Sequence, residues 1–152
     1  MSEPTSDFDQ AIARIQQEID RLERSLYSER TLQEAHRPRN VGRMPEPDAE
    51  ATMRGWCGDT MEFYLQLEGD RIAKVTFWTD GCGPTIACGS MLTSMVEGKT
   101  LEDALRVTPQ DLDDALEGLP EESAHCAELA VKTLHQAITD HKAADDGGGE
   151  DE

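Results

Sequence analysis

Residues 62–78 read EFYLQLEGDRIAKVTFW, in which two segments of alternating apolar and polar residues flank a short turn. The turn at residues 68–70, EGD, favours an antiparallel hairpin with strands over Glu62–Leu67 and Arg71–Trp78. Alternation places one apolar set on a single face of this hairpin. Its members are Phe63, Leu65, Leu67, Ala73, Val75 and Phe77. A weaker signal at Ala51–Arg54 predicts a third strand.

The period of the apolar residues changes from strand-like to helical after the hairpin. One helical stripe ends before Gly98 and consists of Ile86, Met91, Leu92, Met95 and Val96. Thr100 and Thr108 are suited to cap two further helices. A final long helix is predicted from Ser123 to Lys142, with inward residues Leu129, Ala130, Leu134, Ala137 and Ile138. Strands followed by helices predict an α+β fold, a small three-stranded antiparallel sheet covered by helices, with a long C-terminal helix.

Both ends of the chain are expected to lie outside this domain, which we place at residues 25–142. Residues 1–24 are predicted to be an amphipathic helical extension, because apolar residues recur at spacings of four and three. This stripe consists of Phe8, Ile12, Ile15, Ile19, Leu22 and Leu26. We favour packing of the stripe on the chain's own domain over self-association, so a monomer or weak dimer is expected. Residues 143–152, AADDGGGEDE, are predicted to be a disordered acidic tail.

Length and charge restrict the function of the chain. Its 152 residues suffice for one domain, and its formal net charge is -18. This charge argues against nucleic acid and membrane surfaces as partners and favours a basic protein. A signal peptide and a membrane-spanning run are not recognisable, so a cytoplasmic protein is expected. Four cysteines in a reducing compartment indicate metal or sulfur chemistry rather than disulfides.

Three of the cysteines lie at the ends of predicted elements. Cys57 precedes the hairpin, Cys82 follows it, and Cys126 opens the last helix. Because both ends of an antiparallel hairpin meet at one end of the sheet, Cys57 and Cys82 should be neighbours. Helix N-termini are expected to lower the thiol pKa of Cys82 and Cys126 and so to favour thiolates. Asp59 and His125 bring an oxygen and a nitrogen ligand to the same neighbourhood.

These ligand types suit a soft tetrahedral ion, either zinc or the iron of an iron-sulfur cluster. Their spacing does not choose between the two, although the lack of a C-x-x-C motif disfavours a zinc ribbon or finger. His125 is left open between a ligand and a residue that faces solvent or caps the helix. Cys88 lies within the helix that follows Cys82, and we expect it to be a small core residue.

Three segments carry a resemblance to a known family. They read RPRNVG, CGDTMEFYLQLEGDRIAKVTFWTDGCGPTIACGSMLTSMVEGKTLEDA and HCAELAVKTLHQAI. Over residues 27–142 the chain resembles the NifU N-terminal domain, the IscU-type iron-sulfur cluster assembly scaffold. The resemblance implies a SufE/NifU-like α+β carrier that is not an enzyme. Such a scaffold accepts persulfide sulfur from a cysteine desulfurase, binds iron, assembles a transient [2Fe-2S] cluster and passes it to apo iron-sulfur acceptor proteins, with a ferredoxin-type electron donor.

The resemblance also implies residue roles at matching positions. Cys57, Cys82 and Cys126 would be cluster ligands and sulfur acceptors, with Cys126 the preferred persulfide acceptor. Asp59 would tune the lability of the cluster, and His125 would be a candidate ligand. The chain departs from the family at residues 119–123, LPEES, where the pattern has Leu-Pro-Pro-Val-Lys. This departure puts recognition by the dedicated Hsp70-type chaperone in doubt.

Two alternatives use the same thiols. In the first, the chain is a zinc-bound, sulfurtransferase-like sulfur acceptor, and zinc occupies the site in the resting form. Cys126 then leaves the metal to attack the persulfide of a cysteine desulfurase. In the second, zinc is structural and the fold depends on it.

Overall fold

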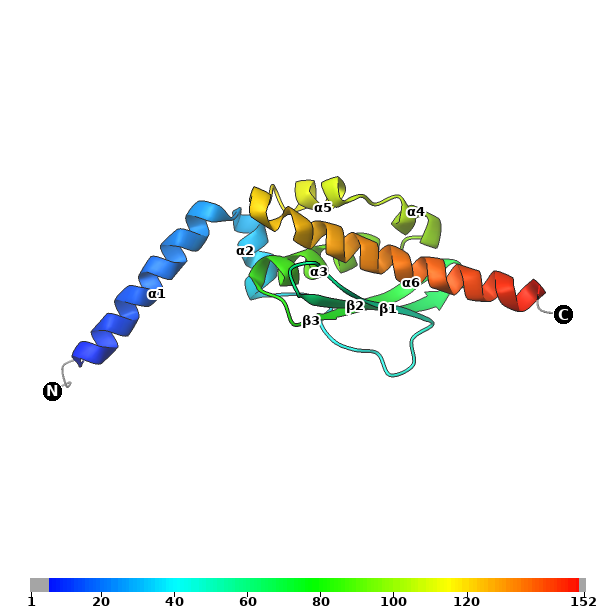
Figure 1. The fold of residues 1–152 in the computed structure, drawn as a ribbon, viewed down its shortest axis with the longest axis horizontal. Helices are drawn as coiled ribbons and strands as arrows, with labels where there is room; N and C mark the ends of the chain where they lie inside the picture. Colours follow the sequence, from blue (N-terminus) through cyan, green and yellow to red (C-terminus); the bar gives the residue numbers. More distant parts are fainter. Residues whose placement is uncertain (1–5, 151–152) are drawn as a thin grey trace.

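The hairpin of residues 62–78 is the centre of the computed structural model, which describes residues 6–150, with side chains described over residues 6–145. Helices cover one side of the sheet, and α1 extends away from it (Figure 1). The elements in chain order are α1 (Asp7–Leu26), α2 (Glu29–His36), β1 (Ala49–Arg54), β2 (Thr60–Glu68), β3 (Arg71–Thr79), α3 (Gly83–Val96), α4 (Leu101–Leu105), α5 (Pro109–Ala115), a 3-10 turn (Glu121–Ser123) and α6 (Ala124–Glu150). The predicted α+β fold is confirmed.

The sheet is antiparallel throughout, in the order β1-β2-β3. Phe63 on β2 lies opposite Phe77 on β3, and both are buried. The register shifts next to the turn, so that Gln66 pairs with Lys74 but Leu67 pairs with Ile72. The skipped residue is Ala73. Our expectation that Ala73 faces the core is therefore wrong: Ala73 is exposed and Ile72 is buried, because a bulge shifts the side-chain alternation by one residue.

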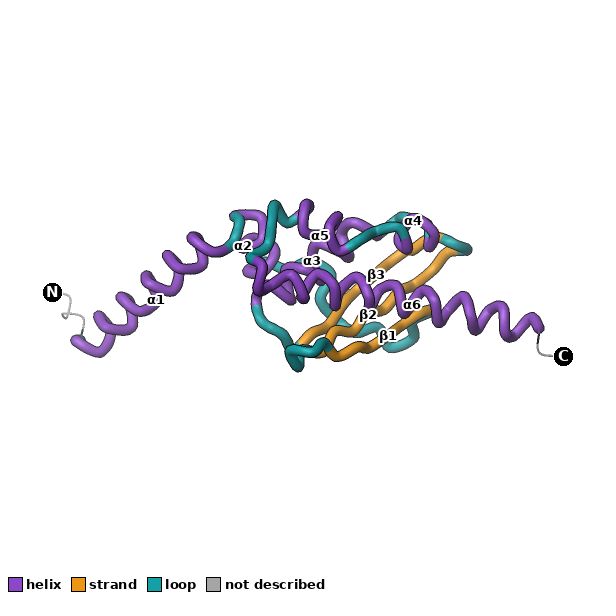
Figure 2. Tube along the Cα trace, turned by 45° about the horizontal axis from the view of Figure 1, so that its top comes forward, coloured by secondary structure: helices purple, strands orange, loops and turns teal. Residues whose placement is uncertain are grey.

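The core lies between the sheet and the two longest covering helices, α3 and α6, which cross its inner face in Figure 2. All five residues of α6 that we predicted to face inward are buried. Helix α3 approaches β3 closely, because a Cβ on Gly89 would lie 2.3 Å from Cδ2 of Phe77. Glycine is therefore required at position 89 for the helix to pack at this distance.

The loop before β1 runs along β3. The Phe77 amide donates to the Asn40 carbonyl (3.0 Å), and the Gly42 amide donates to the Phe77 carbonyl (2.8 Å). Arg43 pairs with the buried Glu62 (2.8 Å), and its guanidinium lies 4.2 Å from the centroid of the Trp78 ring. These contacts hold the loop against the edge of the sheet.

Helix α2 packs against α3 through a buried carboxylate. Glu34 accepts hydrogen bonds from Ser90 on α3 and from the guanidinium of Arg39 (2.7 Å). A buried carboxylate needs such partners to remain charged without a large desolvation cost. The pairing fixes α2 on the domain.

The two short helices begin where the sequence predicts. The Thr100 hydroxyl accepts from the Asp103 amide (3.1 Å), and the Thr108 hydroxyl accepts from the Asp111 amide (3.0 Å). The Asp111 carboxylate accepts from the Thr108 amide in return (3.0 Å), which completes a capping box. Gly98 follows α3 with a φ of 85°, as a residue after a helix C-terminus often does.

Helix α1 does not pack on the domain, which overturns the packing that we favoured for it. None of its residues is buried, and all six residues of its apolar stripe are exposed. The chain turns at Tyr27 and Ser28, so that α1 meets α2 near its end and then points away (Figure 1). A periodic stripe shows that one face of a helix is apolar, but it does not show what covers that face.

Helix α6 continues to Glu150, beyond residue 142, where we expected it to end. Alanine is the strongest helix former, and the alanines at positions 143 and 144 extend the helix into the segment that we expected to be disordered. Residues 151 and 152 of that segment lie outside the described residues. Over residues 6–150, the chain forms no helix that is both long enough and apolar enough to span a bilayer.

The close contact between α3 and β3 predicts a large effect for a small substitution. Gly89→Ala should lower the free energy of unfolding by about 1–3 kcal/mol, because the new methyl group forces the Phe77 ring or the helix to move. Gly83→Ala is the matched control, since a Cβ there would lie 3.7 Å from Ala35, an ordinary contact. Urea denaturation measures both variants. Equal urea midpoints for the two variants would show that the contact between Gly89 and Phe77 does not constrain the packing of α3 on β3.

Candidate metal and sulfur site

Three cysteine-bearing segments meet at one end of the sheet. Cys57 lies in the loop between β1 and β2, Cys82 is the N-cap residue of α3, and Cys126 lies in the first turn of α6. Hydrogen bonds join the first two segments: Asp80 accepts from the Thr60 amide (2.8 Å). The hairpin thus brings its two flanking loops together, as expected for an antiparallel pair.

The loop that carries Cys57 is a tight turn. The Gly58 amide donates to the Gly55 carbonyl (2.9 Å), and the Gly55 amide donates to the Asp59 carbonyl (2.8 Å). Gly58 has a φ of 98°, a conformation that favours glycine. The turn leaves the Cys57 thiol exposed and directs the Asp59 side chain inward, to Thr85.

A buried hydroxyl connects Asp59 to Cys126. The Thr85 hydroxyl donates to Asp59 Oδ2 (3.0 Å), and its oxygen lies 3.3 Å from Cys126 Sγ. Either group can donate in this second contact, because the hydroxyl and the thiol each carry one proton. Thr85 therefore links the loop that carries Asp59 to the first turn of α6, where Cys126 lies.

Cys126 differs from our expectation of a depressed thiol pKa. It is 3% exposed, and burial raises its pKa from 9.0 to about 11, against the opposing effect of the Thr85 hydrogen bond. Cys82, Cys57 and Asp59 lie close enough to raise this pKa further. The loss of hydration outweighs the helix N-terminus, so this thiol is protonated at neutral pH in the absence of a cation.

His125 lies beside this thiol and beneath an aromatic ring. Its Nε2 lies 3.7 Å from Cys126 Sγ, and its ring centroid lies 5.1 Å from that of Trp56 at an interplanar angle of 56°. Trp56 is itself 85% exposed. The imidazole nitrogen of His125 therefore lies near the Cys126 thiol. The exposed indole of Trp56 lies in the loop that carries Cys57.

The thiols differ in their access to solvent. Cys57 and Cys82 are exposed, whereas Cys126 and Cys88 are buried. Cys88 is fully buried in the core, as we expected, and burial raises its pKa well above the ordinary value. Among residues 6–145, no three His, Cys, Asp or Glu side chains already stand at spacings that would hold a metal ion. The site thus gathers the ligand types at one end of the sheet without a preformed set of three ligands among these residues.

Thr85 is the residue of this site that the sequence analysis missed. It lies three residues after Cys82, the N-cap of α3, and residues at this spacing share one face of a helix. That spacing was the available signal. Threonine on an apolar helix face is ordinarily read as a packing residue, which concealed its contact with Asp59.

Comparison with known proteins identifies relatives of this chain. Residues 26–146 match the family model described as NifU-like N terminal domain. A protein of Aquifex aeolicus named iron-sulfur cluster assembly scaffold protein IscU is 42% identical over 118 residues, which cover 76% of this chain and 75% of that one. The Archaeoglobus fulgidus protein named iron-sulfur cluster assembly scaffold protein IscU 1 is 39% identical over 117 residues, 76% of each chain.

Solved structures share the fold. A NifU-like protein (N-terminal) from Brucella abortus aligns with a TM-score of 0.65 at 21% identity, covering 76% of this chain and 93% of that chain. The match to the family model spans most of the chain and includes Cys57, Cys82 and Cys126. The chain therefore belongs to the family of NifU-like N-terminal domains, which includes the IscU-type scaffolds.

Proposed function

We propose that this chain is a scaffold on which an iron-sulfur cluster is assembled and from which the cluster passes to acceptor proteins. The observation that carries the proposal is the convergence of Cys57, Cys82 and Cys126 with Asp59 at one end of the sheet. Relatives named as cluster assembly scaffolds support the same function. The chain acts as a carrier and not as an enzyme, because the cluster is its cargo.

The proposed ligands are the three thiolates, with Asp59 and His125 as the oxygen and nitrogen donors within reach. Thiolates suit iron and sulfide, while a carboxylate is a harder ligand that binds such a cluster weakly. The cargo is a [2Fe-2S] cluster, held transiently. The exposed loop thiols allow loading and release, since the site opens to solvent on the side of Cys57 and Cys82.

Sulfur arrives as the terminal sulfur of a persulfide on a cysteine desulfurase. A thiolate of this chain attacks that sulfur, a new S–S bond forms, and the desulfurase cysteine leaves as a thiolate. The transfer itself is redox neutral. Conversion of the transferred sulfur to sulfide takes two electrons, which a ferredoxin-type donor supplies.

Cys126 is the proposed persulfide acceptor, and its burial sets a condition on the order of events. A thiol with a pKa of about 11 is a poor nucleophile at neutral pH. A bound cation lowers the pKa of a coordinating thiol. Iron therefore binds first at the exposed thiols and Asp59, and Cys126 becomes reactive once the cation is present.

Zinc-bound sulfur acceptance is the second candidate. His125 Nε2, 3.7 Å from Cys126 Sγ, favours it, because zinc accepts imidazole nitrogen together with thiolate sulfur. In this function zinc holds the thiols at rest, and Cys126 leaves the metal to take sulfur from a desulfurase.

Anaerobic reconstitution tests the scaffold against this alternative. With ferrous iron, cysteine and a cysteine desulfurase, the chain should acquire the visible and Mössbauer signature of a [2Fe-2S] cluster. Cys57→Ala, Cys82→Ala and Cys126→Ala should each reduce this signal by at least about tenfold, because each removes a ligand. Cys88→Ala is the control and should assemble normally. A colourless chain with stoichiometric zinc that stimulates the desulfurase would favour the second candidate.

Asp59→Ala should slow the release of the cluster. Removing a carboxylate from a site with three thiolates takes away one negative charge and one weak ligand, so the cluster should persist about fivefold longer, as a change of about 1 kcal/mol gives. Decay of the visible absorption in the presence of an apo-ferredoxin acceptor measures the lifetime. Asp59→Asn keeps the side-chain volume, and it should lengthen the cluster lifetime to the same degree if the charge of Asp59 causes the release. A wild-type lifetime in both variants would contradict the role.

The raised pKa of Cys126 predicts a pH dependence in the metal-free chain. The folded state retains this proton where the unfolded chain releases it, so the contribution of the thiol to stability is present below pH 9 and lost as pH rises toward about 11. The difference in free energy of unfolding between the wild type and Cys126→Ala isolates this contribution. As pH rises through that range, the wild type should lose stability relative to Cys126→Ala. A difference independent of pH would show that burial does not raise the pKa.

A further inference from the structure

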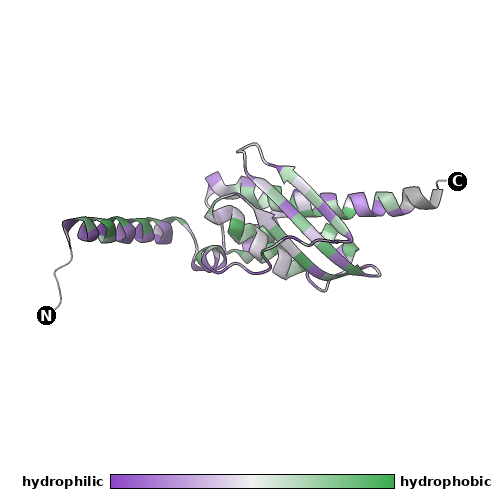
Figure 3. Ribbon diagram, turned by 90° about the horizontal axis from the view of Figure 1, so that it is seen from below, coloured by the Kyte–Doolittle hydropathy of each residue, from purple (hydrophilic) through white to green (hydrophobic). Residues whose placement is uncertain are grey.

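Helix α1 presents an apolar stripe to solvent along its full length. Exposure of the stripe residues ranges from 45% at Ile19 to 72% at Phe8. The apolar residues form a continuous band along one side of the helix in Figure 3. Six such residues on one helix exceed the isolated apolar side chains that are normal at a protein surface. An exposed apolar surface of this kind is typical of a site that binds a partner.

The residues that border the stripe are acidic. At about 100° per residue, Asp9, Glu18 and Glu23 lie within about 100° of the centre of the stripe. The arginines Arg14 and Arg21 lie about 120–140° away on the opposite side of the helix. Arg21 reaches back to pair with Glu18, but exposed pairs of this kind contribute little and exchange readily. A complementary surface would carry positive charge beside its apolar centre.

A second copy of this chain is a poor complement to the stripe. Parallel pairing with the stripe as the a/d seam would bring Glu18 of one copy to Glu23 of the other, and antiparallel pairing would bring the two Glu18 side chains together. The net charge of -18 on each chain adds to the repulsion. The helix has 20 residues, fewer than three heptads, which is marginal for a coiled coil held by its seam alone.

A bilayer surface is also a poor complement. Helices that lie in the membrane interface carry Lys and Arg on their polar face, where these side chains meet anionic headgroups. Helix α1 instead borders its stripe with carboxylates, which anionic lipids repel.

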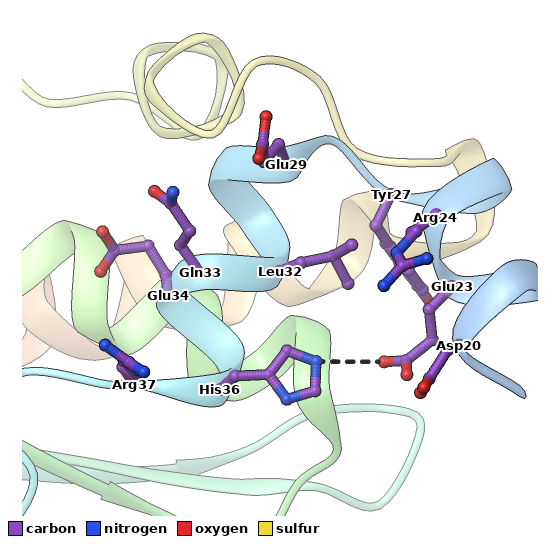
Figure 4. A pocket seen from close by; sticks show the side chains of 10 residues that line it. All are labelled: Asp20, Glu23, Arg24, Tyr27, Glu29, Leu32, Gln33, Glu34, His36 and Arg37. Atoms are coloured by element: carbon purple, nitrogen blue, oxygen red, sulfur yellow. Dashed lines mark ion pairs between the residues drawn. The ribbon is translucent and has the colours of Figure 1, made fainter. Parts of the chain in front are cut away.

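The junction of α1 with α2 leaves the stripe accessible. A pocket of about 900 Å³ lies in the angle between the two helices, and α1 contributes the polar residues Asp20, Glu23 and Arg24 to its wall. His36 of α2 points toward Glu23 across this pocket, with 3.6 Å between Nε2 and Oε2 (Figure 4). Helix α1 therefore meets α2 through polar residues near its C-terminal end, and the stripe residues stay exposed.

We propose that α1 is a docking helix whose apolar stripe binds an apolar groove rimmed by Lys or Arg side chains on a partner protein. Helix-in-groove recognition uses anchors at i, i+3, i+4 and i+7, which is the spacing of this stripe. The apolar centre supplies affinity, and the carboxylates that border it select a basic rim. This role is independent of the cluster chemistry.

Two synthetic helical peptides of matched length test the charge preference. Both carry Leu at the a and d positions; one carries Lys and the other Glu at the e and g positions. In calorimetric titrations of the full-length chain, the Lys peptide should bind at least about tenfold more tightly than the Glu peptide. Its affinity should fall as salt is raised from about 50 mM to about 500 mM. Failure to bind the Lys peptide would overturn the proposal.

Variants of α1 locate the binding face. Ile15→Glu and Ile19→Glu should abolish binding, whereas Gln17→Glu adds the same charge on the opposite face and should retain it. Asp9→Lys combined with Glu18→Lys should reverse the preference toward the Glu peptide. Circular dichroism checks that each variant keeps its helix, and melting temperatures should match the wild type because α1 has no buried residue. Equal loss of binding in Gln17→Glu and Ile15→Glu would contradict a face-specific site.

Two further measurements test whether the stripe binds a second copy of the chain or a lipid bilayer instead. If the full-length chain sediments as a dimer that Ile15→Glu converts to a monomer, the stripe binds a second copy and the proposal is wrong. If the chain binds phosphatidylcholine vesicles, with or without phosphatidylserine, and Ile15→Glu prevents it, the stripe binds lipid and the proposal is likewise wrong. We expect a monomer that leaves vesicles unbound.

Discussion

Strand β3 and helix α3 touch at one point where no side chain larger than hydrogen fits, at Gly89 beneath the Phe77 ring. The same Phe77 holds the preceding loop through both of its backbone groups and lies opposite Phe63 in the sheet. Sheet, loop and covering helix are therefore tied together at a single residue. Since α3 begins at the Cys82 loop, this contact also sets where Cys82 and Thr85 stand relative to the strands. The position of Cys82 thus depends on packing about two helical turns away.

The site combines groups that are unfavourable together in the absence of a cation. Bringing three thiolates and a carboxylate together would concentrate negative charge in a chain that already carries -18. The protein avoids this cost in two ways: Cys126 is buried and neutral, and Cys57 and Cys82 remain in water on loops. Binding of a cation at these thiols, as proposed above, would therefore be linked to their deprotonation.

The local sequence pattern predicted some of these structural features but not others. Alternation around residues 68–70 predicted the hairpin, and its geometry predicted that Cys57 and Cys82 approach each other. The exposure of Ala73 could not be foreseen, because a bulge depends on how two strands pair and not on either strand alone. The helix-terminus rule failed for Cys126, since it takes no account of burial, which only tertiary packing decides. Thr85 was missed because its role depends on a carboxylate 26 residues away.

The short connection at Tyr27 and Ser28 has a consequence for any molecule bound to α1. A helix of 20 residues extends about 30 Å from this elbow, so a bound molecule stays within that radius of the domain. Within such a volume its effective concentration is on the order of millimolar, whatever its concentration in solution. A second contact with the thiol-bearing end of the sheet would then be mostly formed if its dissociation constant lies well below about 1 mM, although the same contact would scarcely form between free molecules at micromolar concentrations. A molecule bound to α1 could thus contact the cysteines several times before it dissociates from the helix.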